Sequence, residues 1–323
     1  MESALPAFDK IVADSDLDGL CGAAILKKHN PDAEVIFSHA ALIRSGANDD
    51  IIDDKTVIVD LPFHANCGWY VDHHKTNMPN DSQLEEFIGN NKKFDWQPTP
   101  SAARLAYELV KEHTNLANFV DSMPVVDDLD SGKITLEEFK KDGTLLKLSR
   151  TLGLKNRDYM IKLVDELASG KSFEEIFSLQ FVAEKISKVS AEREQLEAIV
   201  ARNTTIIDRL AICRLDNTGF TSNGYVVTAW AGEAADACCI IHGYQDGTLE
   251  DLDRPPLSAS FYANSFLEDG QNKFDLSKLA TRFDEDGGGH VNACGCRIQP
   301  PGLEANLSIW LDMWRNRNED LAI

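Results

Sequence analysis

The order of apolar and polar positions predicts alternating strands and helices in the first part of the chain. Short apolar or β-branched runs predict three strands, at Lys10–Ala13, Glu34–Ser38 and Thr56–Asp60. Leu20–Lys28 and Pro100–His113 have apolar residues at helical spacing, and Thr99 is the predicted cap of the second helix. This alternation favours a doubly wound, mostly parallel α/β sheet, in which ligands lie at the carboxyl ends of the strands.

The pattern changes twice further along the chain. The middle is predicted to be helical, over Arg157–Ala168 and a long segment at Phe173–Arg202. Strands are then expected at Thr204–Leu215, Gly224–Trp230, Leu257–Ala263 and Cys294–Ile298, and helices at Ala234–Ile241, Asp275–Arg282 and Leu303–Trp314. We therefore expect a first α/β domain over residues 1–135, a helical connector over 136–200, and a smaller second α/β domain over 201–323.

Composition narrows the class of protein. The 323 residues are 43% hydrophobic and carry a net charge of −21, which is typical of a globular protein and argues against broad binding to long nucleic acid. An anionic substrate stays compatible with this charge if metal ions supply positive charge. No apolar run reaches the ~18 residues of a membrane span, and the first residues lack the features of a signal peptide. The spacing of the seven cysteines indicates no disulfide framework and favours the cytoplasm.

Acidic residues and histidines follow three of the predicted strands. Asp14, Asp16 and Asp18 follow the first strand, Asp60 ends the sequence TVIVD, and Asp72-His73-His74 follow Trp69–Val71. Alternate residues of an extended segment project to one side, so we expect the first three carboxylates to point together. Such carboxylates repel one another unless a cation lies among them, and with imidazole they suit Mn²⁺, Mg²⁺ or Fe²⁺. Taken alone, the first three acids fit a solvated turn, Asp60 fits a strand cap, and the two histidines fit the surface. Their occurrence together at three strand ends favours a metal site.

These residues belong to a larger set that resembles the DHH phosphoesterases. The sequence DSDLDGLCGAAIL is similar to the first motif in the form seen in RecJ-type single-strand exonucleases, and VIVD is similar to the second motif. Asp72-His73-His74 is the motif that names the family. VVDDLDSG at Val125–Gly132 resembles the fourth motif, and GGGHVNACG at Gly287–Gly295 resembles the glycine-rich signature of the associated second domain, DHHA1. The five motifs occur in the family's order.

The resemblance implies two metal ions in the first domain. Asp16 would hold one ion and Asp18 the other, Asp60 would bridge them, and His73 and Asp127 would complete the second. Asp14 and Asp130 are further candidate ligands.

The resemblance also implies roles toward the substrate. His74 would face the scissile phosphate, and Asp72 would orient the two histidines. Substrate contacts in the second domain would come from Gly287, Gly288, Gly289 and His290. Relatives have an arginine in an S-x-R-S segment that Ser258–Phe261 (SASF) lacks, and Arg282 is the candidate substitute.

By this resemblance, the chain is expected to be a manganese-dependent phosphohydrolase in which a hydroxide shared by two ions attacks phosphorus, with Mg²⁺ as the alternative ion. A phosphodiesterase acting on short oligonucleotides or dinucleotides is favoured, because no basic track with stacking aromatics is present for a long strand. A pyrophosphatase or exopolyphosphatase with the same site is the nearest alternative. A catalytically silent nucleotide-binding module is another, although the intact acids argue against it.

Four other patterns are given plainer interpretations. Asp127–Glu138 resembles an EF-hand loop, but Leu129 stands where a calcium ligand is needed, and Pro124 in the preceding Phe119–Val126 argues against an entering helix. His290, Cys294 and Cys296 lack a fourth zinc ligand, and His64 is interpreted as an exposed loop residue. The irregular heptads of Phe173–Arg202 favour a connector over a coiled coil, which leaves a homodimer as an alternative.

Overall fold

The computed structural model describes residues 5–323 and divides them into two compact units. One unit runs up to Ser131 and also includes Gly143–Val189, and the other consists of Gly132–Asp142 and Ser190–Ile323. The chain therefore crosses from one unit to the other three times, and both units draw residues from the predicted connector.

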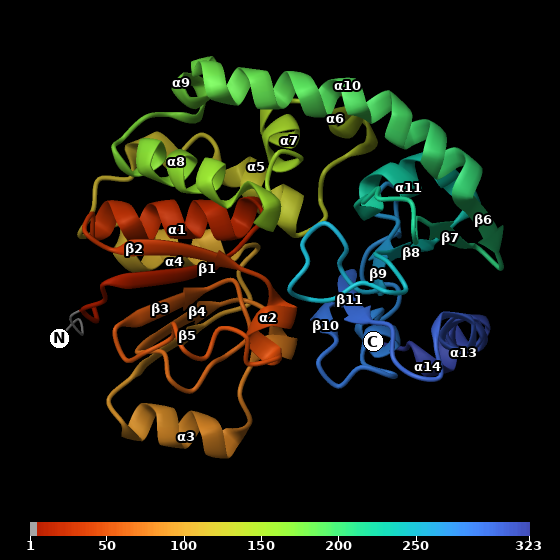
Figure 1. Ribbon diagram of the computed structural model, residues 1–323, viewed down its shortest axis with the longest axis horizontal. Coiled ribbons are helices and arrows are strands. Elements are labelled where there is room, and N and C mark those ends of the chain that lie inside the picture. Colours follow the sequence, from red (N-terminus) through yellow and green to blue (C-terminus); the bar gives the residue numbers. More distant parts are fainter. Residues whose placement is uncertain (1–4) are drawn as a thin grey trace. The chain divides into compact units, whose positions relative to one another are not determined.

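The first unit is built on a five-stranded sheet whose strands are all parallel, in the order β2-β1-β3-β4-β5 (Figure 1). The strands are β1 (Lys10–Asp14), β2 (Glu34–Ser38), β3 (Thr56–Val59), β4 (Trp69–Asp72) and β5 (Lys93–Trp96). Their β-branched and aromatic residues are buried on both faces, as expected for a parallel sheet covered by helices. The predicted parallel α/β architecture is confirmed.

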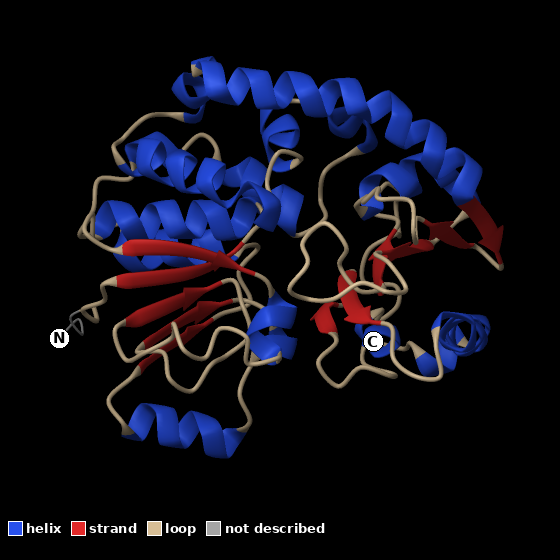
Figure 2. Ribbon diagram, in the orientation of Figure 1, coloured by secondary structure: helices blue, strands red, loops and turns tan. Residues whose placement is uncertain are grey.

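Helices cover both faces of this sheet (Figure 2). One face packs against α1 (Leu17–His29), α4 (Ala102–Val110) and α8 (Arg157–Ala168). On the other face lie α2 (Ala40–Arg44) and α3 (Asp81–Gly89). The remaining helices of the unit include η1 (Lys75–Asn77), α5 (Met123–Asp130), α7 (Thr144–Ser149), α9 (Phe173–Ser178) and the start of α10 (Gln180–Asn203).

The start of α1 differs from the prediction of an extended acidic segment. The helix begins at Leu17, with Asp16 as its N-cap, so Asp18 lies in the first helical turn and not on a strand. The residues from Leu20 to Leu26 are apolar or small and are all buried, so this part of the helix has no exposed face. Acidic side chains are favoured at the N-cap and in the first turn of a helix, because the backbone N–H groups there need hydrogen-bond acceptors.

Two further predictions for the first unit are wrong. The cap of α4 is Ser101 and not Thr99, because the Ser101 hydroxyl accepts a hydrogen bond from the backbone N–H of Arg104. The segment before Asp127 does form a helix, α5, in which Pro124 lies at the start. A proline in the first turn lacks an N–H that would have no helical partner there, so it does not break the helix.

The second unit contains a six-stranded mixed sheet in the order β10-β11-β9-β8-β7-β6. Its strands are β6 (Thr204–Ile207), β7 (Leu210–Arg214), β8 (Ala237–His242), β9 (Ser258–Ala263), β10 (Gly288–His290) and β11 (Ala293–Arg297). Its helices are α6 (Leu136–Lys141), part of α10, α11 (Gly224–Ala231), α12 (Ser277–Ala280), α13 (Leu303–Arg315) and α14 (Arg317–Asp320). Only β7 and β8 pair in parallel.

For two elements of the second unit, the predicted type of secondary structure is wrong. Gly224–Trp230, predicted as a strand, is helix α11, and most of Ala234–Ile241, predicted as a helix, is strand β8. The apolar run of β8 is buried on both faces of the sheet, so it shows no alternation along the sequence. Short apolar runs of this kind do not distinguish a buried strand from a buried helix.

All seven cysteines are buried and carry no disulfide. Within residues 5–323, no helix is long and apolar enough to cross a membrane.

Candidate metal centre

Acidic and histidine side chains gather at the carboxyl ends of β1, β3 and β4. Asp14 is the last residue of β1, Asp60 follows β3, and Asp72 ends β4 and leads into the two histidines. Because these strands are parallel neighbours, their ends meet at one edge of the sheet. The sequence prediction of an acidic cluster at this edge is confirmed.

The ring of His73 is the geometric centre of the cluster. Its Nε2 atom lies 3.5 Å from Asp18 Oδ2, 3.7 Å from Asp60 Oδ1 and 3.3 Å from Asp130 Oδ2. His73, Asp18 and Asp60 are almost completely buried. These atoms lie close enough together for several of them to bind one metal ion.

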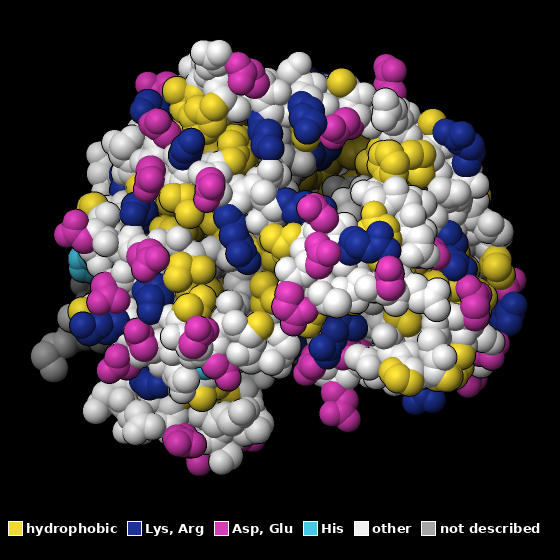
Figure 3. Space-filling view, in the orientation of Figure 1, with side chains coloured by type: hydrophobic (Ala, Val, Ile, Leu, Met, Phe, Trp, Pro, Cys, Tyr) yellow, Lys and Arg dark blue, Asp and Glu magenta, His cyan; other side chains and the backbone are white. Residues whose placement is uncertain are grey.

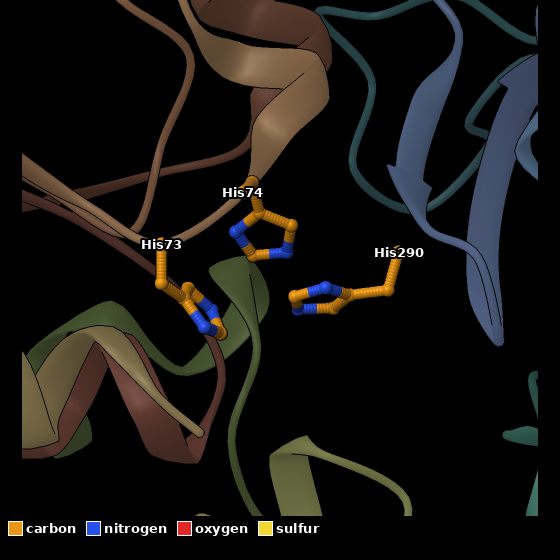
Figure 4. A group of neighbouring side chains, drawn as sticks. All are labelled: His73, His74 and His290. Carbon is orange, nitrogen blue, oxygen red and sulfur yellow. The ribbon is translucent and has the colours of Figure 1, made fainter. Parts of the chain in front are cut away.

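The neighbouring His74 adds a second imidazole. Its Nδ1 atom lies 3.5 Å from Asp60 Oδ1 and 3.0 Å from Asp72 Oδ1. Figure 4 shows the rings of His73 and His74 side by side. The two rings meet edge to face, and their centroids are 4.4 Å apart. His73 thus belongs to two overlapping groups of donor atoms, one with Asp18 and Asp130 and one with Asp60, Asp72 and His74.

Because these carboxylates are buried close together, their ionised forms are electrostatically unfavourable when no cation is bound. Burial raises the pKa values of Asp14, Asp18 and Asp60 well above the usual range for aspartate, and the negative charges of neighbouring carboxylates raise them further. The same two causes raise the pKa of Asp130 to about 7. Among the described residues, Asp60 Oδ1 accepts no hydrogen bond. Buried carboxylate oxygens beside an imidazole fit a divalent cation such as Mn²⁺ or Mg²⁺, which would remove their mutual repulsion.

Asp72 differs from these acids because protein donors surround it. Its Oδ1 atom accepts hydrogen bonds from the His73 backbone N–H (2.8 Å) and from His74 Nδ1 (3.0 Å). Its Oδ2 atom accepts from the Tyr70 hydroxyl (2.8 Å) and from Asn77 Nδ2 (2.9 Å). Although burial opposes ionisation, the charge and hydrogen bond of His74 hold the pKa of Asp72 below its ordinary value. This carboxylate is therefore suited to orienting His74.

The two candidate acids on α5 have different surroundings. Asp127 Oδ2 accepts from Arg104 Nε (2.9 Å) and Nη2 (2.6 Å), and Asp127 Oδ1 accepts from the Ser101 hydroxyl (2.8 Å). Asp130, one helical turn later, instead lies beside His73. The structure thus brings Asp130 into the donor cluster and pairs Asp127 with an arginine.

The two acids before α1 lie at the rim of the cluster. Asp16 Oδ1 accepts from the backbone N–H of Gly19, and Asp14 Oδ1 accepts from that of Ser15. The charge of Asp16 raises the pKa of Asp14, Asp18 and Asp60, so its carboxylate lies within electrostatic range of all three. Asp16 itself is exposed, which leaves it accessible to an ion or a substrate.

The segment between β5 and α4 supports the cluster and was missed by the sequence analysis. His73 Nδ1 donates to the Thr99 carbonyl (2.9 Å), which directs Nε2 toward the acids. The backbone N–H groups of Ala102 and Ala103, at the start of α4, each donate to Asp18 (2.7 Å). The only sequence signal was a predicted helix start, since backbone donors leave no trace in residue types.

The predicted substrate residues lie in the second unit. Gly288, Gly289 and His290 form β10, which pairs with β11, and Gly287 precedes them. Gly289 has φ +134°, and a Cβ there would lie 2.5 Å from the Ala293 carbonyl oxygen, so a larger residue does not fit. His290 is also drawn in Figure 4. Arg282 follows α12, and its guanidinium lies 6.0 Å from the ring centroid of Phe283.

His64 has a partner away from the cluster. Its Nε2 atom lies 3.1 Å from Asp49 Oδ1, and its Nδ1 atom accepts from the backbone N–H of Asn66.

Comparisons with known proteins identify the fold. A pGpG-specific phosphodiesterase, PggH from Vibrio cholerae, matches with a TM-score of 0.64 and 21% identity, covering 96% of this chain and 99% of that one. An exopolyphosphatase-related protein from Bacteroides fragilis matches with a TM-score of 0.51 and 14% identity, covering 96% and 92%. No protein-family model and no curated protein sequence matches. The chain has a DHH-family fold, which confirms the predicted resemblance at the level of the fold.

Proposed function

We propose that this protein is a metal-dependent phosphohydrolase, and that it cleaves phosphodiester bonds in short oligonucleotides or dinucleotides. The observation that carries the proposal is the group formed by the buried residues Asp18, Asp60 and His73 and the half-buried Asp130 at the carboxyl edge of the parallel sheet. Burial and mutual repulsion disfavour the ionised form of these carboxylates unless a cation is bound. Two cations at this edge can activate water and neutralise phosphoryl oxygens, which is the chemistry that phosphate hydrolysis needs.

The residues of the cluster would divide the work of holding two divalent ions, which we propose to be Mn²⁺. Asp60 would bridge the ions, Asp18, His73 and Asp130 would bind one of them, and Asp16 would bind the other with Asp14 as a further donor. Asp130 replaces Asp127 in this assignment because Arg104 already occupies the Asp127 carboxylate. Mg²⁺ is the alternative ion, since it prefers the same oxygen donors.

The remaining residues would act on the substrate. His74 would donate to the scissile phosphate, and Asp72 would fix its ring. Gly287, Gly288, Gly289, His290 and Arg282 of the second unit would contact the rest of the substrate. The names of the two structural neighbours, a pGpG phosphodiesterase and an exopolyphosphatase-related protein, both support an anionic phosphate substrate. Seven unpaired thiols support a cytoplasmic location, and a homodimer through the long helix stays a prediction.

The test is release of mononucleotides from the dinucleotides pGpG and pApA, with Mn²⁺ and then with EDTA. We expect Asp60→Asn to reduce the rate by more than about 100-fold, the upper range for losing an outer-shell partner of a metal. Asp54→Asn is the matched control, because Asp54 is an exposed acid of the same unit. Equal rates for these two variants would contradict the proposal.

A second pair of variants tests the assignment of ligands. Asp130→Asn should weaken Mn²⁺ binding measured by calorimetry, since this variant loses a charged donor of the cluster. Asp127→Asn should chiefly lower stability, because it breaks the pair with Arg104. A larger loss of Mn²⁺ affinity in Asp127→Asn would reverse the assignment.

The same site could hydrolyse pyrophosphate or polyphosphate. The lack of an arginine in Ser258–Phe261 and the similarity to an exopolyphosphatase-related protein favour this alternative. Metal-dependent and Asp60-dependent phosphate release from pyrophosphate or tripolyphosphate, with no cleavage of dinucleotides, would establish it. If neither class of substrate is cleaved, a nucleotide-binding module without activity becomes the better interpretation.

A further inference from the structure

Four donors converge on the fully buried carboxylate of Asp72, and two of them come from residues outside the DHH motif. We propose that Tyr70 and Asn77 are positioning residues, which fix the ring of His74 by holding Asp72 in one orientation. This inference rests on the proposed function, because it assigns to His74 a role toward the substrate.

The two oxygens of Asp72 accept hydrogen bonds from different groups of donors. Oδ2 accepts from the Tyr70 hydroxyl (2.8 Å) and from Asn77 Nδ2 (2.9 Å), so both of these donors lie on the side away from His74. Oδ1 accepts from His74 Nδ1 (3.0 Å) and from the backbone N–H of His73. Two fixed donors on Oδ2 prevent the carboxylate from rotating and so determine where Oδ1 lies.

Both positioning residues are themselves held in place. The Tyr70 ring is fully buried in the sheet and stacks on Phe94 at a centroid distance of 5.1 Å. Its hydroxyl proton is shared between Asp72 Oδ2 and the more distant Asn77 carbonyl (3.3 Å). Asn77 Oδ1 accepts from Arg44 Nη2 (2.8 Å), which orients the amide so that Nδ2 points at Asp72. The network thus extends from α2 through η1 to the end of β4.

A second carboxylate, that of Asp60, lies near enough to compete with Asp72 for the Nδ1 proton of His74. His74 Nδ1 lies 3.0 Å from Asp72 Oδ1 and only 3.5 Å from Asp60 Oδ1. If Asp72 turned away, the Nδ1 proton would find its next acceptor in the carboxylate that we propose as the bridging ligand. Tyr70 and Asn77 therefore keep the His74 ring away from the ligand and keep its Nε2 atom in a fixed direction.

The test is a set of double mutants. Asn77→Ala and Tyr70→Phe should each lower kcat on the dinucleotide by about 10- to 100-fold and leave KM within about twofold, as for outer-shell partners of a site. In a His74→Ala background the same substitutions should cost less than about twofold, because the residue through which they act is gone. Asn90→Ala and Tyr159→Phe are matched controls in the same unit and should retain kcat.

A purely structural role predicts a different result, because a loss of stability would reduce activity equally in both backgrounds. Additive losses would therefore overturn the proposal. Asn77→Asp and Asn77→Gln separate charge from geometry, and only a residue that keeps a donor near Asp72 should restore part of kcat.

An independent measurement separates this proposal from the proposed function. Nitrogen-15 NMR of the histidine side chains in the full chain should show His74 with its proton on Nδ1, and Asn77→Ala should change that signal. If the wild-type protein cleaves no phosphate substrate but this signal changes as expected, the proposed function fails and the positioning network stands. If the wild-type protein is active and neither kcat nor the signal responds, the positioning network is wrong.

Discussion

Asp60 and Asp72 are buried carboxylates at the same edge of one sheet, yet their surroundings are opposite. Four protein donors satisfy Asp72, and although burial opposes its ionisation, the charge and hydrogen bond of His74 hold its pKa below the ordinary value. Burial and the charges of Asp18 and Asp16 raise the pKa of Asp60 well above its usual range. The pattern of residues shows only that both acids end or follow a strand, and the family resemblance implies that Asp60 binds metal and Asp72 orients the histidines. The different donors around each oxygen support this proposed division of roles.

The pKa of Asp130 leads to a prediction about stability without metal. Burial, followed by the charge of Asp16, raises this pKa from 3.8 to about 7, so the folded protein binds the proton more tightly than the unfolded chain. The resulting contribution to the free energy of unfolding is complete below about pH 4 and is lost as pH rises through about 7. In EDTA, Asp130→Asn should therefore gain melting temperature relative to wild type as pH rises from about 5 to about 8.

Thermal unfolding followed by circular dichroism measures this difference. The variant Asp54→Asn is the control, since Asp54 is an exposed acid of the same unit. Addition of Mn²⁺ should reverse the order and make the wild type more stable, because the ion binds the ionised cluster. A constant difference between Asp130→Asn and wild type from about pH 5 to about pH 8 would contradict the prediction.

At the scale of elements, the start of α4 connects helix stability to the metal centre. Ser101 caps the helix through the Arg104 N–H and also donates to Asp127, while the next two N–H groups hold Asp18. We expect Ser101→Ala to lower the free energy of unfolding by about 1–2 kcal/mol and also to weaken Mn²⁺ binding. Urea unfolding and calorimetry measure the two effects.

Ser172→Ala is the matched control for this prediction. Ser172 caps α9 in the same unit through the Glu175 N–H, and no residue of the metal centre is among its hydrogen-bond partners. This variant should lose a similar amount of stability and retain its Mn²⁺ affinity. Equal Mn²⁺ affinity in Ser101→Ala and wild type would show that the cap of α4 does not support Asp18.

The elements themselves were predictable where the sequence pattern had one interpretation. TVIVD forms a strand followed by an acid, and Arg157–Ala168 forms α8 with the predicted bounds. In the second unit, ACCIIH and GYVVTAW are both short apolar runs, and only the packed sheet shows which one is the strand. The glycine-rich motif was found from sequence because its residue types are unusual. The backbone donors of α4 were not, because any residue can supply them.

For the whole molecule, the net charge of −21 should limit the length of substrate. Figure 3 shows Lys and Arg side chains scattered among Asp and Glu on the face drawn, without a continuous basic track. We expect the cleavage rate to fall steeply for single strands between two and about twenty nucleotides. We also expect added salt to improve binding of the longer strands, because it screens repulsion. Rates that rise with length would contradict this expectation.

The three crossings between the units have a consequence for the order in which the protein can fold during synthesis. The first unit is fully synthesised at Val189, but residues 132–142 belong to the second unit. Within that segment, Phe139 packs on Tyr225 and Phe266, which leave the ribosome much later. A nascent chain stalled soon after Val189 has left the ribosome would therefore contain every residue of the candidate metal centre, while Phe139 still lacks the aromatic side chains on which it packs. A segment with such an exposed aromatic residue is a natural target for a chaperone or a protease.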